Sequence, residues 1–170
     1  MKRILALAAC ALLCSTAALA QAEKGDVATG VNLLYGFGIK SMAIGAKFQY
    51  TIIDHVRTEA AFNYFFKKDF VSMWDVSLNA HYLIPVHQEN FYLYPMAGLT
   101  FASTNYDSEG ASRKLLPSEI GKSHSRIGVN LGAGAQYQYS DHVGFTLEYR
   151  YSVMKDIDQS VIGVGVNYKF

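Results

Sequence analysis

The last twelve residues of the chain, Gln159 to Phe170, alternate between large apolar side chains and small or polar ones, and they end on an aromatic ring. Successive side chains of a β-strand point to opposite faces of its sheet, so this stretch predicts a strand with one apolar face. On the other face Val161 is the one apolar exception. Lipid-facing strands of membrane barrels end in this way, because aromatic rings settle at the membrane–water boundary. The apolar face consists of Ile162, Val164, Val166, Tyr168 and Phe170.

The N-terminus has the pattern of a secretory signal peptide. Lys2 and Arg3 are followed by an uncharged run over residues 4–20 that ends in small residues. This pattern predicts a signal peptide over residues 1–20, with cleavage after Ala20 or Ala22. An uncleaved membrane anchor is the alternative, for which the run is short.

The composition excludes several classes of site. Both cysteines, Cys10 and Cys14, lie in the predicted leader, so no disulfide framework or thiolate metal site is expected after export. The formal net charge is only +1, which is too small to predict electrostatic binding of nucleic acid. His55 and His142 each follow an aspartate at a predicted tight turn, where aspartate bonds the nearby backbone. No carboxylate cluster accompanies them at ligand spacing, so neither a metal site nor a cofactor is predicted.

Alternation recurs along most of the chain between turn signals. Most segments are about ten residues long, which suits a tilted strand that crosses a bilayer. Pro95 interrupts the fifth segment and predicts a local irregularity, because proline lacks an N–H donor for the ladder. Since no strand edge can stay unpaired in hydrocarbon, the last strand must pair with the first. The predicted fold is all-β, an eight-stranded antiparallel up-and-down transmembrane β-barrel, with strands over residues 27–35, 42–52, 56–66, 71–84, 90–103, 124–139, 143–153 and 159–170.

A soluble β-barrel, with apolar residues inside and polar residues outside, is the competing interpretation. The polar faces argue against it, because they are rich in Gly, Ala, Ser, Thr, Asn and Gln and lack the dense charge of a water surface. The apolar faces end in rings on both sides of an aliphatic band, as a bilayer demands. The rings expected at the turn-rich end include Tyr50, Tyr82, Phe91, Tyr137, Tyr139, Tyr168 and Phe170, and those at the other end include Phe62, Tyr64, Phe66, Trp74, Phe101, Tyr149 and Tyr151.

The inward faces predict a lumen filled by paired charges. An eight-stranded barrel has an interior just wide enough for side chains to fill. Lys47 is expected diagonal to Glu59, and glycines are expected beside Glu148 and Arg150 to leave them room: Gly134 and Gly132 on one flank, Gly163 and Gly165 on the other. The predicted network is a paired polar plug with a structural role, and a narrow porin-like channel for ions or small solutes is the alternative. Its members are Lys47, Arg57, Glu59, Asp75, Arg126, Glu148, Arg150 and Lys169.

The export signal, the eight-strand meander and the terminal Tyr168-Lys169-Phe170 resemble the small outer-membrane β-barrel family of Gram-negative bacteria, the porin-family or OmpA/OmpX-like barrels. The resemblance covers residues 25–170. It implies an outer-membrane location with both termini periplasmic, and contact with outer-membrane lipid. It also implies that the barrel-assembly machinery recognises the C-terminal aromatic, with Phe170 in that role and Val166 and Tyr168 as supporting lipid-facing positions.

Two further functions can be weighed from the sequence. The loop over residues 105–122 is long and charged, which makes it the best candidate for contact with an extracellular partner. An enzyme would need a nucleophile with a base in reach, and Ser123-His124-Ser125 is the one suggestive cluster. Adjacent residues of a strand point to opposite faces, so this cluster is poorly placed and no enzyme is predicted. A structural or surface-interaction role is therefore expected.

Overall fold

A computed structural model describes residues 24–68, 71–86, 90–106, 123–154 and 158–170. The predicted signal peptide lies outside the described residues, and so does most of the loop over residues 105–122. All regular elements of the described chain are strands: β1 (Val27–Gly36), β2 (Ser41–Ile53), β3 (Val56–Lys68), β4 (Val71–Tyr82), β5 (Ile84–Pro85), β6 (Phe91–Tyr106), β7 (Ser123–Gln138), β8 (Val143–Met154) and β9 (Gln159–Lys169). In the described part, no helix is long and apolar enough to cross a membrane.

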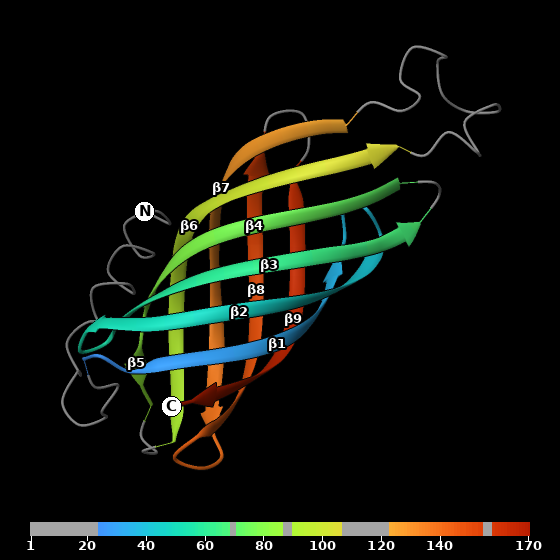
Figure 1. Ribbon diagram of the computed structural model, residues 1–170. Helices are drawn as coiled ribbons and strands as arrows, with labels where there is room; N and C mark the ends of the chain where they lie inside the picture. The colour runs from blue at the N-terminus through green and yellow to red at the C-terminus, as the bar shows by residue number, and fades with distance from the viewer. Residues whose placement is uncertain (1–23, 69–70, 87–89, 107–122, 155–157) are drawn as a thin grey trace, which may run out of the picture.

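The strands close into a barrel of eight (Figure 1). Each strand pairs antiparallel with its neighbour in sequence, and β1 pairs with β9 along a ladder that matches Val31 with Val166. The two-residue β5 continues β4, and both pair with β6, so together they form one wall position. The predicted eight-stranded up-and-down barrel and its closing seam are confirmed.

The expected irregularity at Pro95 is present, and it falls on one side of the strand. β6 pairs with β7 without interruption, with Pro95 opposite Ala133. On its other side the ladder stops after the pair of His81 with Met96 and resumes at Ile84 with Leu93. The backbone N–H of Leu83 instead donates to the carbonyl of His55 at 2.7 Å. A missing proline donor explains why β4 and β5 are separate strands.

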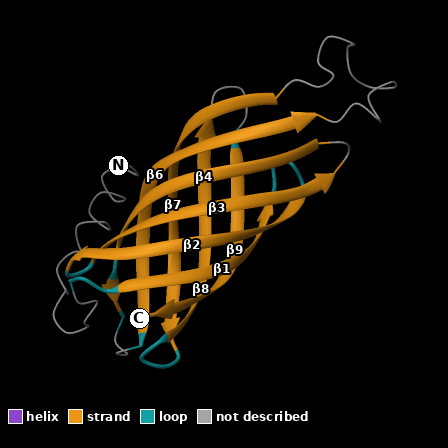
Figure 2. Cartoon of the chain, viewed as in Figure 1, coloured by secondary structure: helices purple, strands orange, loops and turns teal. Residues whose placement is uncertain are grey.

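The barrel has two distinct ends. The turn end is where β1 begins and β9 finishes, next to the turns at residues 54–55 and 139–142 (Figure 2). The loop end is the opposite one, where β1 leads into β2 through residues 37–40. The outer surface carries aromatic side chains near both ends, and some of the rings touch. Phe62 stacks on Trp74, Trp74 lies 5.7 Å from Phe101, and Tyr168 meets Phe170 edge to face.

The apolar faces point outward and the charged faces inward. Leu33, Leu78 and Leu99 are more than half exposed on the outer wall. The charged Lys47, Glu59 and Asp75 are buried inside the barrel. This is the reverse of a soluble barrel, and the soluble interpretation is therefore wrong.

Candidate functional site

The lumen is crossed in its middle by a group of side chains around Lys47, here called the lysine cluster: Lys47, Gln49, Glu59, Tyr94, Thr146 and Glu148. The ammonium group of Lys47 is completely buried. It donates to Glu148 Oε1 at 2.9 Å and to Thr146 Oγ1 at 3.0 Å, and it lies 3.8 Å from Glu59 Oε2. Because β2 and β8 are separated by β1 and β9 in the wall, the pair of Lys47 with Glu148 joins strands that are not neighbours.

Both carboxylates of the lysine cluster have further donors. The Tyr94 hydroxyl donates to Glu148 Oε1 at 2.6 Å. Gln49 Nε2 donates to Glu59 Oε2 at 2.7 Å, and Gln49 Oε1 accepts from Asn167 at 3.2 Å. A buried charge is tolerable when its remaining hydrogen-bonding capacity is met in this way. The charges are thus fixed by partners on several sides.

The Tyr94 ring contacts two planar groups, the His81 imidazole and the Arg57 guanidinium. Its ring stacks on His81 with centroids 4.9 Å apart, and the Arg57 guanidinium lies 5.1 Å from its centroid. Arg57 also donates to Gln136 Oε1 at 2.7 Å and lies 3.2 Å from His81 Nδ1. Since arginine has only donors, Nδ1 of His81 is the acceptor. Stacking and cation–π contact therefore orient the hydroxyl that bonds Glu148.

A second group of charges, here called the arginine cluster, consists of Arg150, Asp75, Ser77 and Asn63. Arg150 donates to Asp75 Oδ2 and to Ser77 Oγ, each at 3.0 Å. Asn63 Nδ2 donates to Asp75 Oδ1 at 2.7 Å. The contacts of Arg150 connect β8 with β4, which is not its neighbour in the wall, so they too cross the lumen. Asn63 supports Asp75 from the adjacent strand β3, where it is the direct partner of Asp75.

A cavity of about 20 Å³ has both Glu148 and Arg150 in its wall and so lies where the two clusters meet. Asn32 and Asn63 also line it, and the Oδ1 atom of each is buried without a hydrogen-bond partner. A space of this size holds about one water molecule. Around this small space, the described side chains in the middle of the lumen are mostly polar and hydrogen-bonded to one another.

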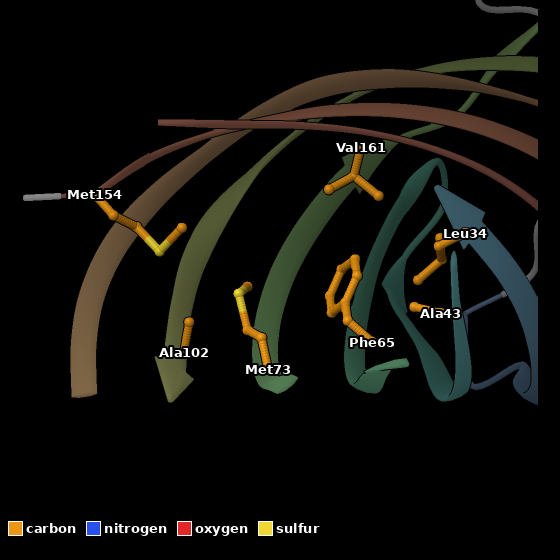
Figure 3. Close-up of a cluster of buried hydrophobic side chains, with 7 residues drawn as sticks. All are labelled: Leu34, Ala43, Phe65, Met73, Ala102, Met154 and Val161. Atoms are coloured by element: carbon orange, nitrogen blue, oxygen red, sulfur yellow. The ribbon is translucent and has the colours of Figure 1, made fainter. Parts of the chain in front are cut away.

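Near the loop end a cluster of buried apolar side chains lies inside the barrel, here called the apolar layer. Leu34, Ala43, Phe65 and Met73 are successive partners across β1 to β4. Figure 3 shows that the layer points into the space that the strands enclose. Its members come from seven different strands and are Leu34, Ala43, Phe65, Met73, Ala102, Met154 and Val161.

The apolar layer corrects the expectation of a polar lumen. Val161 is not an isolated apolar exception on the inward face, and Phe65, which the alternation pattern left unassigned, also points inward. Counting every second residue of β3 from Arg57 reaches Asn63 and then Phe65. Extending the alternation of β3 by one more step therefore predicts that Phe65 points inward, and this is the pattern in the sequence that indicates the apolar layer.

The network residues named from the sequence fall into three groups. Lys169 is not in the lumen clusters, because it lies at the turn-end rim, a third exposed, and pairs with Asp26 at 2.6 Å. Arg126 is half-buried on β7, and among the described residues it shares none of the contacts of either cluster. The contacts described above place Lys47, Glu59 and Glu148 in the lysine cluster with Arg57 beside it, and Asp75 and Arg150 in the arginine cluster.

The glycines stand beside the charges as expected, but they make room for other side chains. Gly134 pairs with Glu148 and Gly132 with Arg150. A Cβ at Gly134 would strike the Tyr94 ring, one at Gly132 the Tyr149 carbonyl and, at 3.0 Å, Met96, and one at Gly163 the side chain of Leu34. Gly165 is opposite Thr146, and Arg150 is opposite Val161. Gly163 lies directly opposite Glu148, as expected. The side chains nearest to Gly134, Gly132 and Gly163 are nevertheless those of Tyr94, Met96 and Leu34.

The residues named for assembly and catalysis are placed as follows. Val166, Tyr168 and Phe170 all point outward and are exposed. The side chains of Ser123 and His124 lie outside what the structure describes. Within the described ranges, no three His, Cys, Asp or Glu side chains gather as a metal site would require.

Comparison with known proteins gives the same architecture. The N-terminal β-barrel domain of Pseudomonas aeruginosa OprF is 18% identical, with a TM-score of 0.70 over 86% of this chain and 98% of that chain. Neisserial surface protein A is 16% identical, with a TM-score of 0.66 over 85% and 96% of the two chains. Ail of Yersinia pestis is 17% identical, with a TM-score of 0.60 over 86% and 99%. No curated protein sequence matches the chain.

At these identities the structural likenesses establish the fold alone. The sequence profile described as "Outer membrane protein beta-barrel domain" matches residues 6–170, which is nearly the whole chain. The outward apolar faces and the closed strand ladder of this chain are features that a membrane-spanning barrel requires. The chain therefore belongs to the outer membrane protein β-barrel domain family.

Proposed function

We propose that the protein is an integral outer-membrane barrel with a plugged lumen, and that its role is structural or surface interaction without catalysis. The observation that carries the proposal is the double closure of the lumen. Ion pairs of Lys47 and Arg150 reach across the middle, and the apolar layer fills the loop end.

The two closures would stop ions for different reasons. An ion that passes the middle must separate a buried charge pair from its partner, which leaves an uncompensated charge. An ion that reaches the apolar layer must lose its water, because a hydrophobic constriction excludes water. The interior of an eight-stranded barrel offers no detour around either.

A narrow channel is the second candidate. The observation that favours it is the cavity of about 20 Å³, with the unpartnered oxygens of Asn32 and Asn63 in or beside its wall. Such oxygens could hold water, and a chain of waters would need further spaces on both sides.

Conductance decides between the two candidates. The purified barrel is inserted into planar bilayers, and the same preparation is run unheated and heated on a gel to verify that it is folded. The plugged lumen predicts no stable single-channel steps from a preparation that shows the mobility shift of a folded barrel. Stable steps from the folded protein would overturn the plug and favour the channel.

We also propose that the turn end faces the periplasm, with both termini on that side. Short turns on the periplasmic side are the rule for bacterial barrels. The predicted leader would export the chain, and the exposed Val166, Tyr168 and Phe170 would be presented to the barrel-assembly machinery. In intact cells, an impermeant maleimide should label Phe37→Cys at the loop end and spare Ser140→Cys at the turn end. The opposite labelling would reverse the orientation.

Contact with an extracellular partner through residues 105–122 is part of the same proposal. Deleting this loop should reduce attachment of expressing cells to a host surface while leaving the heat-dependent gel shift unchanged. Equal attachment with and without the loop would restrict the protein to a structural role.

A further inference from the structure

The outer wall carries a groove that the lumen does not explain. It has a volume of about 740 Å³ and lies over β1 to β4 and β9. Its lining includes the small outward side chains of Thr29, Ala46 and Ala60, and the rings of Phe48, Phe62 and Tyr168. Lys47 also lines it, but the ammonium group of Lys47 is turned into the lumen and completely buried.

Strand pairing explains why this part of the wall is hollow. Phe48 is the partner of both Thr29 and Ala60, so one ring stands between two small residues. In the next outward row Ala46 is the partner of both Val31 and Phe62. Small side chains therefore alternate with rings along and across β2 and β3, while β1 contributes only Thr29 and Val31 to these rows. The result is a depression flanked by rings that are about half exposed.

The surroundings determine what can fill the groove. The outer wall of a barrel in this family faces the hydrocarbon of the membrane, so the material in contact with the groove is acyl chains. Lipid tails are as apolar as the groove itself, so preferential binding there must come from close packing rather than from the hydrophobic effect. A depression bounded by fixed strands gives one chain more contacts than a flat wall does.

The groove extends to Tyr168, one of the outward aromatic rings at the turn end, where polar groups begin. The imidazole of His142 stacks on the Tyr168 ring at 5.5 Å. The rim over these strands carries charges of both signs, which suits a headgroup that has both a phosphate and an ammonium group. The rim charges are Lys24, Asp26, Asp54, Asp141 and Lys169, with Lys169 paired to Asp26. The His142 imidazole lies beside them, with Nδ1 at 2.9 Å from the Lys169 carbonyl.

We propose that this groove binds one acyl chain of a zwitterionic aminophospholipid whose headgroup lies at the turn-end rim. The lipid is held by packing between the rings of Phe48, Phe62 and Tyr168, with its phosphate near His142. The assignment to the periplasmic leaflet rests on the orientation proposed above. The binding itself does not, because it depends only on the shape of the wall and on the rim.

Native mass spectrometry of the barrel, released from its membrane in a mild detergent, tests the proposal. The wild-type barrel should retain one phospholipid, and its mass identifies the class. Ala46→Leu fills the groove and should lower the lipid-bound fraction about tenfold, which corresponds to about 1.4 kcal/mol. Ala133→Leu adds the same atoms to an outward position of β7 that does not line the groove and should leave retention unchanged.

A second matched pair removes material instead of adding it. Phe62→Ala deletes one wall of the groove, and Phe145→Ala deletes a ring of similar exposure on β8 that does not line it. Only Phe62→Ala should reduce retention. The heat-dependent gel shift verifies that each variant is folded. If the Ala46→Leu barrel does not fold, the comparison of Phe62→Ala with Phe145→Ala still tests lipid binding in the groove.

Three results would overturn the proposal. These are a wild-type barrel that retains no lipid, equal losses in the groove and control variants, or a retained lipid whose mass is that of lipid A. None of them bears on conductance or on maleimide labelling, so the plugged lumen and the orientation stand or fall separately.

Discussion

The two groups of side chains that we propose as closures of the lumen have opposite chemistry. In the middle, long charged side chains from strands that are not neighbours meet in hydrogen bonds of 2.9–3.0 Å. At the loop end, the apolar layer brings together uncharged side chains from seven strands. The two groups should differ in how much the free energy of unfolding falls when one member is removed.

A charge cluster stabilises the barrel only while each charged member keeps its partner. Removing one member leaves its partner charged, buried and unpaired, and the cost exceeds the value of the lost contact. An apolar layer loses only the transfer free energy of the deleted atoms and the cost of the cavity they leave. The middle of the lumen should therefore be the more fragile closure, and the loop end the more tolerant one.

The largest loss is expected for Glu148→Ala. Lys47 would keep its hydrogen bond to Thr146, but its only remaining carboxylate would be the more distant Glu59 at 3.8 Å. The Tyr94 hydroxyl would lose its acceptor. Breaking a buried pair in this way costs about 3–5 kcal/mol. The free energy of unfolding, measured by denaturant titration of the barrel in detergent, checks the value. An unchanged midpoint would count against the plug.

Thr146→Val is the matched control for that variant. Thr146 accepts from the same ammonium group as Glu148, at 3.0 Å, but carries no charge. Its loss should cost about 1.5–3 kcal/mol, the usual range for a hydrogen bond to a charged group. If Glu148→Ala costs no more than Thr146→Val, charge pairing contributes nothing beyond the hydrogen bond.

Phe65→Ala tests the other closure. The Phe65 ring is completely buried in the apolar layer, and its deletion should lower the free energy of unfolding by about 3 kcal/mol. Its neighbour Phe66 points outward and is about half exposed, so Phe66→Ala is the matched control on the same strand. Similar losses for the two variants would show that Phe65 does not seal the lumen.

Phe65 and Phe66 also show where sequence reasoning succeeds and where it ends. The strands, the closure and the outward face follow from alternation with a period of two, which the backbone of a strand imposes. Where two rings are adjacent, alternation no longer tells which one is inside. At the loop end of β3 the inward face turns apolar, so polarity stops marking the lumen at that point.

The charged residues show a second limit. Lys47 and Glu59 could be placed together, because diagonal neighbours on adjacent strands follow from register. The bond of Lys47 to Glu148 could not, because it crosses the lumen between strands that do not pair. Lys169 follows the inward alternation, but it lies at the end of its strand, where the barrel interior has given way to the rim.

Gly134→Ala should produce an intermediate effect and tests the corrected role of the glycines. The new Cβ would strike the Tyr94 ring, which is buried and stacked on His81 and so has little freedom to move. Overpacking of this kind costs about 1–3 kcal/mol. Chemical denaturation measures the loss, and double-mutant analysis with Tyr94→Phe separates the clash from the hydrogen bond to Glu148.

Gly144→Ala is the control for Gly134→Ala. At Gly144 the added Cβ would lie 3.0 Å from Gln138 Oε1 and 3.3 Å from Gln136 Nε2, which are the ends of flexible side chains that can move aside. The stability should change by less than about 0.5 kcal/mol. Equal costs at the two positions would mean that the Tyr94 ring does not need the space beside Gly134.

The smallest effect is expected for Lys169→Ala at the turn-end rim. The ion pair of Lys169 with Asp26 is short, 2.6 Å, but its two side chains are 35% and 22% exposed. Water screens such a pair, so its loss should cost about 0–1 kcal/mol. The cost should shrink further as salt is raised, because the Debye length falls to about 3 Å at 1 M. Glu148→Ala should show no comparable salt dependence, since its partner is sealed from the solvent. Denaturant titrations at low and high salt compare the two variants, and a salt-sensitive Glu148→Ala would mean that solvent ions reach the middle of the lumen.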